Sequence, residues 1–139
     1  MYRKKSLISK IYRKVQRSKD LAFVLKDFYS FSTDTDQLIR ALRKLTKDKV
    51  LIKIGKGVYA KAKKSELTGK YIPAGGLLNS GRQALEKFGI KTLPSSYAAA
   101  YNRGETTQVP TGRVIGVDRR VSREISFNGV SLSYERIQA

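Results

Sequence analysis

The chain has 139 residues, which fits one domain or two small ones, and it contains neither cysteine nor histidine. These absences exclude disulfides and thiolate metal sites, together with the commonest general base and metal ligand. Its 29 lysines and arginines against 11 acidic residues give a net charge of +18, which concentrates polyanions such as nucleic acid or an anionic membrane surface.

The first predicted element is an amphipathic helix over Ser6–Arg17, with apolar side chains recurring on one stripe. Its basic face is either a solvated surface or a phosphate-contacting one. Lys10, Arg13 and Lys14 interrupt the apolar run that a signal peptide needs, and no run of about 18 apolar residues exists to span a membrane. We therefore expect a cytoplasmic protein with no membrane partner.

Two short elements are predicted next. Leu21–Val24 is a short apolar run typical of a small strand, and Lys26–Phe31 is expected to be a short helix. We assign Phe28 and Phe31 to the core rather than to base stacking.

A third helix is predicted to start at Asp34 or Thr35, either of which can cap it, and to end near Asp48. Its leucines build one apolar face. Rotation by about 100° per residue gathers polar side chains on the opposite face, namely Gln37, Arg40, Lys44 and Lys47. Two short acids just before a helix are usually caps, so we predict no metal site there.

A hairpin follows directly, with strands at Val50–Ile54 and Val58–Ala60 around Gly55-Lys56-Gly57. Glycine permits a tight turn and a close backbone approach. A lysine at such a tip adds nothing to a core, whereas it can reach the phosphates of a polyanion.

The order helix, strand, helix, helix, strand, strand is that of a winged helix-turn-helix domain, whose recognition helix enters the major groove beside the hairpin. Residues 1–64 carry 19 basic and 5 acidic residues (+14), whereas residues 65–139 carry 10 and 6 (+4). Double-stranded DNA is therefore the predicted partner, and bases would be read by Thr35, Gln37 and Arg40. The side chains predicted to contact the backbone are Arg43, Lys44, Lys47, Lys53 and Lys56.

Residues 65–139 are predicted to form a small α+β domain that ends in a β-hairpin. After a connector at 61–69, the expected elements are a helix at Leu77–Phe88, a short helix capped by Ser95 or Ser96, a strand at Val114–Val117, and strands Ile125–Phe127 and Val130–Tyr134 around Asn128-Gly129. The polar string 101–108 is either a binding surface or a loop bonded to itself. Carboxylates in this half are scattered without acid-base spacing, so we expect no enzyme and no cofactor.

Four stretches carry a resemblance to a known family: QLIRALRKLTKDKVLIKIGKGVYAKAK, LTGKYIPAGG, PSSYAAAYNRGETTQVPTGRVIGV and ISFNGVSLSYE. The first resembles the N-terminal winged helix of AbiEi-like antitoxins of type IV toxin-antitoxin systems, and the others look like pieces of the same group of antitoxins and transcriptional regulators. The resemblance implies an N-terminal domain that binds and represses its own promoter. It also implies a C-terminal domain that counters a nucleotidyltransferase-like toxin, with or without direct contact.

The sequence thus predicts a sequence-specific DNA-binding repressor acting as an antitoxin. Helix-turn-helix proteins often bind as dimers, so a homodimer on DNA is a further hypothesis. Two alternatives remain open at this point. The same basic face serves structured RNA, or the chain is a non-catalytic module that binds a toxin partner.

Overall fold

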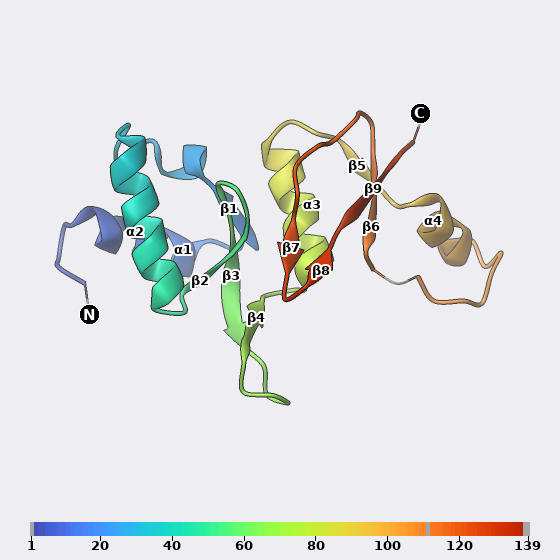
Figure 1. Ribbon diagram of the computed structural model, residues 1–139, viewed down its shortest axis with the longest axis horizontal. Helices are drawn as coiled ribbons and strands as arrows, with labels where there is room; N and C mark the ends of the chain where they lie inside the picture. Colours follow the sequence, from blue (N-terminus) through green and yellow to red (C-terminus); the bar gives the residue numbers. More distant parts are fainter. Residues whose placement is uncertain (1, 111, 138–139) are drawn as a thin grey trace.

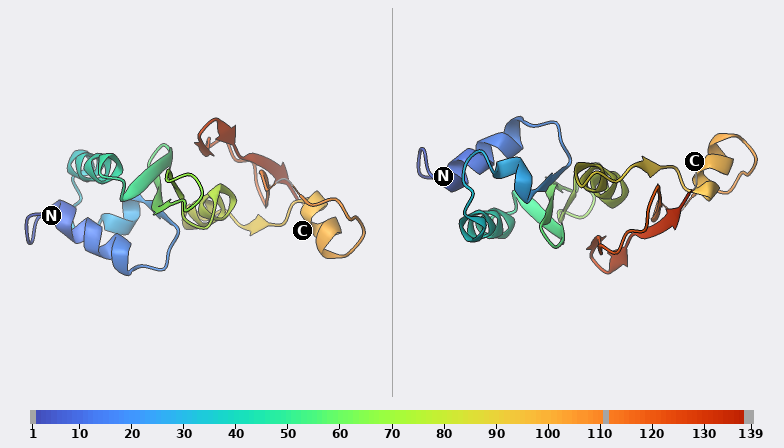
Figure 2. Two further views of the ribbon diagram at one scale, coloured as in Figure 1. Left: turned by 90° about the horizontal axis from the view of Figure 1, so that it is seen from below. Right: turned by 90° about the horizontal axis from the view of Figure 1, so that it is seen from above.

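The computed structural model describes residues 2–110 and 112–137, and its fold is mixed α+β, as the sequence predicts. In chain order the elements are α1 (Leu7–Arg17), β1 (Ala22–Val24), the 3-10 helix η1 (Leu25–Phe28), α2 (Thr35–Lys47), β2 (Leu51–Gly55), β3 (Val58–Lys64), β4 (Tyr71–Pro73), α3 (Leu77–Lys87), β5 (Thr92–Leu93), α4 (Ser96–Asn102), β6 (Val114–Val117), β7 (Ser126–Phe127), β8 (Val130–Ser131) and β9 (Ser133–Arg136). Figures 1 and 2 show an elongated molecule with α1 and α2 at one end, α4 at the other and α3 between them. Within the described ranges, no helix has both the length and the apolar character needed to cross a bilayer.

The N-terminal sheet has β3 at its centre, flanked by β1 on one side and β2 on the other. Both pairings are antiparallel, and Tyr59 of β3 lies opposite Phe23 in one and opposite Lys53 in the other. Because side chains alternate between the two faces of a strand, Phe23 and Tyr59 join the core formed with α1 and α2. Their neighbours Ala22 and Ala60 point to the other face and join a second core.

Helix α2 begins and packs as its sequence predicts. The Asp34 side chain caps it by accepting a hydrogen bond from the Gln37 backbone N–H at 3.2 Å, so Asp34 rather than Thr35 is the N-cap. Leu38, Leu42 and Leu45 are fully buried against α1 and the sheet. Burial of this stripe leaves the opposite, polar face of α2 exposed to solvent.

The β2–β3 hairpin turns through Lys56 and Gly57. Gly55 is paired with Val58, and Gly57 has a φ of +69°, a left-handed conformation that glycine adopts without strain. A register shift between Lys53 and Gly55 marks a β-bulge next to the turn. The predicted hairpin is thus confirmed, with Lys56 exposed at its tip.

The predicted connector at 61–69 is wrong in its first half. β3 continues to Lys64 and pairs antiparallel with β4, so that Lys63 lies opposite Ile72. The lysines and alanines of this stretch lack the apolar pattern of a strand. It nevertheless forms one, because β4 pairs with the backbone of Ala62–Lys64 through hydrogen bonds. Figure 1 shows the resulting hairpin projecting from the body of the molecule.

The C-terminal half contains the predicted α3, α4, β6 and the hairpin at Asn128-Gly129, where Phe127 pairs with Val130. Its last predicted strand, Val130–Tyr134, is instead two strands in different sheets. Leu132 is buried between them, and β9 then pairs in parallel with β6 in the order β5-β6-β9. The last strand of the described residues, β9, therefore belongs to a parallel pair, and the prediction that this half ends in a β-hairpin is wrong.

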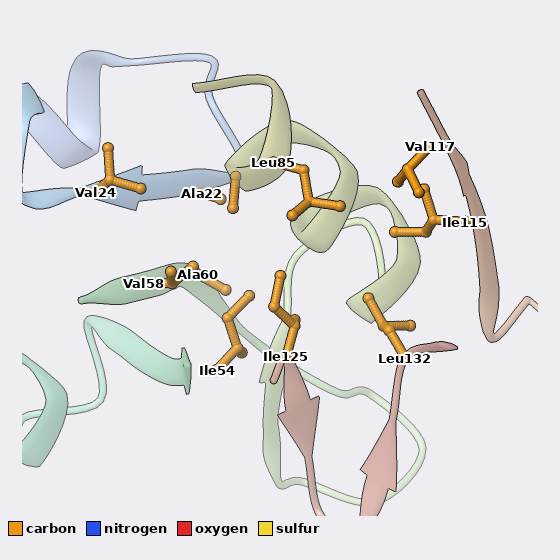
Figure 3. Close-up of a cluster of buried hydrophobic side chains, with 11 residues drawn as sticks. Ala22, Val24, Ile54, Val58, Ala60, Leu85, Ile115, Val117, Ile125 and Leu132 are labelled. Atoms are coloured by element: carbon orange, nitrogen blue, oxygen red, sulfur yellow. The ribbon is translucent and has the colours of Figure 1, made fainter. Parts of the chain in front are cut away.

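A second core joins the two halves of the chain across the N-terminal sheet. Ala22, Ala60 and Ile54 pack with Leu85 of α3 and with Ile125, which precedes β7. Figure 3 shows these side chains converging in the space between β1, β3 and α3. The predicted domain boundary between residues 64 and 65 stays a prediction, and the buried contacts of α3 cross it.

Polar contacts at the end of α3 strengthen this junction. The Lys87 ammonium lies 2.9 Å from Asp20 Oδ2 and 2.8 Å from Asp27 Oδ2, and it donates to the Ala22 carbonyl at 2.8 Å. The Gln83 side-chain oxygen accepts hydrogen bonds from the backbone N–H groups at the start of β1. Helix α3 thus provides hydrogen-bond acceptors for backbone N–H groups at the edge of β1. These contacts fix the orientation of the C-terminal half against the sheet.

Candidate nucleic-acid interface

A groove of about 880 Å³ runs between α2 and the β2–β3 hairpin. Four of the eight residues predicted to bind DNA line it. Thr35 and Arg43 come from α2, and Lys53 and Lys56 come from the hairpin. All four are exposed, so the helix and the hairpin that follows it present their polar side chains to one surface.

The other four predicted residues are exposed on α2 but do not line this groove. Helical geometry puts Arg40 and Lys47 on the outermost face of α2, opposite its buried leucines. Gln37 and Lys44 lie on the flank about half a turn from Thr35, away from the hairpin. These four therefore share the exposed polar face of α2 that the sequence predicts, and this face lies beside the groove rather than in it.

Lys44 is also engaged in local contacts. Its ammonium lies 3.0 Å from Asp48 Oδ1, one turn further along the helix. The Asp48 carboxylate accepts a second hydrogen bond from the Tyr2 hydroxyl at 2.8 Å. These bonds, first from Tyr2 and then from Lys44, lower the pKa of Asp48, and the burial and hydrogen bond of Tyr2 raise its own pKa to about 12. The charge of Lys44 is partly neutralised by this carboxylate, unlike the charges in the groove.

The groove combines an apolar floor with uncompensated positive charge. Tyr59 is 4% exposed in the floor, where burial raises the pKa of its hydroxyl and the positive charge of Arg43 opposes the increase. None of the ion pairs found in residues 2–110 and 112–137 involves Arg43, Lys53 or Lys56. Several cations facing one concave surface give it a positive potential that attracts anions.

Sequence reasoning missed further residues of the groove. Lys26 and Tyr29 enter it from η1 and the turn after it, while Phe88 and Arg123 enter it from the C-terminal half. Arg123 lies far from α2 in the sequence, and only the basic run DRRVSR at 118–123 gave a signal of its presence.

The comparison with protein families matches residues 8–136 to a family of unknown function, DUF6088. The chain belongs to the DUF6088 family. The range matched to DUF6088 includes every residue that lines the groove, from Val24 to Arg123. No curated protein and no solved structure is significantly similar to the chain.

The polar string 101–108 of this DUF6088 member forms contacts within itself and with α4. Arg103 and Glu105 form a two-pronged ion pair with distances of 2.8 and 3.0 Å, and the Tyr97 hydroxyl donates to Gln108 at 2.5 Å. These local bonds occupy several polar groups of the string, whose first two residues belong to α4 rather than to a loop. Its use as a binding surface stays a prediction. Across the described residues, no group of three or more carboxylate, histidine or cysteine side chains is arranged to hold a metal ion.

Proposed function

We propose that this chain is a non-enzymatic, sequence-specific DNA-binding regulator that represses its own promoter. The observation that carries the proposal is the groove in which Arg43 of α2 and Lys53 and Lys56 of the hairpin face the same space without carboxylate partners. A surface with this curvature and charge fits one strand of a duplex backbone.

The element order also supports a winged helix-turn-helix assignment for residues 1–64. α1, β1, η1, α2, β2 and β3 follow one another, and β3 pairs between β1 and β2. In such a domain α2 is the recognition helix and the β2–β3 hairpin is the wing. The short η1 takes the place of the second helix, which the sequence predicted at Lys26–Phe31.

We infer that different residues of this surface contact the bases and the phosphates. Thr35, Gln37 and Arg40 lie near the start of α2 and would reach base edges in the major groove. Phosphates would be bound by the cations that follow on α2 and by those on the hairpin, namely Arg43, Lys44, Lys47, Lys53 and Lys56.

Fluorescence anisotropy with labelled duplexes tests the proposal. The probe is the region upstream of this gene, compared with a scrambled duplex of equal length and with a structured RNA. Arg40→Ala is expected to weaken binding to the specific duplex by about 1–3 kcal/mol and to relax the preference over the scrambled one. Lys56→Ala should weaken both duplexes alike and lower the salt slope by about 1.

Lys91→Ala is a matched control, because Lys91 is exposed and lies outside the groove. It should leave both the sequence preference and the salt slope close to those of the wild type. Equal binding of the upstream and scrambled duplexes would refute sequence-specific repression. Tighter binding of the RNA at matched salt would assign the basic surface to RNA instead.

We further propose, from the resemblance to AbiEi-like proteins, that the repressor is an antitoxin and that its toxin is nucleotidyltransferase-like. Co-expression with the adjacent reading frame tests this role. The antitoxin should restore growth that the neighbouring product inhibits, and absence of any such inhibition contradicts the assignment.

Sedimentation of the protein with and without duplex tests the homodimer.

A further inference from the structure

We propose that the C-terminal half supplies a third wall of the DNA surface, with Arg123 binding a backbone phosphate beside the wing. This inference rests on the proposed function and deepens it. It assigns to residues 65–139 a direct part in nucleic-acid binding, where sequence reasoning gave them a separate role.

Arg123 is held at the groove from two sides. Its guanidinium carbon lies 3.7 Å from the centroid of the Phe88 ring, in the stacked geometry that arginine favours on aromatic faces. Its Nη1 donates to the carbonyl oxygen of Lys56, the residue at the tip of the hairpin, at 3.4 Å. The side chain therefore lies over the end of the wing, although 66 residues of sequence separate the two.

The same side chain keeps most of its donor capacity. A guanidinium has five N–H donors, and in the described part of the chain its only hydrogen bond is the one to Lys56. No ion pair found there involves Arg123. An oriented, partly unsatisfied guanidinium next to Arg43, Lys53 and Lys56 is suited to bind a phosphate through two parallel N–H groups.

The backbone around Arg123 is fixed, so this position is built into the fold. The Tyr134 hydroxyl of β9 donates to the Arg123 carbonyl at 2.7 Å, and Ile125 is fully buried in the shared core. On the other side, Gly55 of the wing approaches so closely that a Cβ there would lie 2.8 Å from the Glu124 carbonyl oxygen.

This contact explains one of the two glycines of the hairpin. Gly57 serves the turn, whereas Gly55 leaves room for the backbone of residues 122–126 rather than for DNA. The wing is thus supported along its side by the segment that carries Arg123. Glu124 lines a second cleft along the hairpin, which Lys53, Lys56 and Arg123 also line. No ion pair within the described ranges joins Glu124 to any of these three cations.

The experiment measures the dissociation constant of the full chain for the labelled upstream duplex over a series of salt concentrations. Arg123→Met removes the charge and keeps an apolar side chain to pack on Phe88. We expect the slope of log K against log salt to fall in magnitude by about 0.9, which corresponds to about eightfold weaker binding at 0.1 M salt. Arg123→Lys, which keeps the charge, should retain the slope with a smaller loss of affinity.

Arg120→Met is the matched control, because it removes one exposed charge from the same loop but outside the groove. Its slope should stay closer to the wild-type value than that of Arg123→Met. Melting temperatures of all three variants verify that each is folded.

The outcomes separate this inference from the proposed function. If the wild type binds the duplex and Arg40→Ala weakens it, but Arg123→Met keeps the wild-type slope, Arg123 binds no phosphate and only this inference fails. If Arg123→Met loses affinity while the salt slope stays unchanged, this inference also fails, because Arg123 would then only support the wing. If the wild type binds no duplex, the proposed function fails and this inference fails with it.

Discussion

Replacing Lys87 with methionine is expected to weaken the attachment of α3 to the N-terminal sheet. The ammonium contacts Asp20, Asp27 and the Ala22 carbonyl within 2.9 Å, and it lies 4.9 Å from the centroid of the Phe23 ring. Methionine keeps the apolar stem over Phe23 and removes only the charge and its three donors. The variant therefore isolates the polar part of the junction.

The magnitude follows from the exposure of the two carboxylates. Removing one partner of a fully buried ion pair costs about 3–5 kcal/mol. Here the Asp20 side chain is 45% exposed and becomes hydrated, while Asp27 is 18% exposed and still accepts a bond from the Val24 N–H. We therefore expect a loss of about 2 kcal/mol in the free energy of unfolding. For a chain of this size, that loss lowers the melting temperature by about 6 °C.

Thermal unfolding followed by circular dichroism measures the effect, with urea unfolding as a second readout. Lys91→Met is the control, because it removes an exposed lysine from the same half of the chain. Combining Lys87→Met with Asp27→Asn should cost less than the sum of the two single changes, since each removes the same contact. A melting temperature for Lys87→Met equal to that of Lys91→Met would refute the argument that these contacts hold the two halves together.

Three further changes test other parts of the fold. Asp34→Ala removes the N-cap of α2 and should cost about 1 kcal/mol in urea unfolding. Gly116→Ala would place a Cβ 2.6 Å from a main-chain oxygen of β5, so it should lower the melting temperature and disturb that pairing in amide exchange. Asp48→Asn removes the carboxylate that the Tyr2 hydroxyl and Lys44 ammonium bind. The pKa of Asp48 is below its usual 3.8, so its contribution to stability is present above that value and disappears as the pH falls through the lowered pKa. The free energy of unfolding of Asp48→Asn should thus be lower than that of the wild type at neutral pH, and the two values should converge in acid.

Local signals in the sequence predicted most of the helices and turns. The periodic leucines and the cap residue fixed α2 to within a residue, and Asn128-Gly129 marked a hairpin that the structure contains. The two glycines around Lys56 marked another. Each of these signals acts over a few residues, because capping bonds, turn dihedrals and amphipathic faces are properties of a single element.

Contacts between distant segments were not predictable in the same way. β9 was assigned to the preceding hairpin, because nothing in Ser133–Arg136 indicates that it pairs with β6. The continuation of β3 to Lys64 was missed, since its partner β4 is a three-residue strand with a proline. For the groove, the residues of α2 and the hairpin were predicted from local patterns, and Arg123 was missed because its position depends on how the C-terminal half docks.

The parallel pairing of β6 with β9 has a consequence for the order in which the protein matures. During synthesis, α1 through β3 leave the ribosome first and begin to fold through contacts between neighbouring segments. The Tyr134 hydroxyl that binds the Arg123 carbonyl is synthesised after the hairpin and after Arg123 itself. A chain still under translation therefore presents the hairpin before residues 122–126, which support its side, and β9, which binds them, have been synthesised.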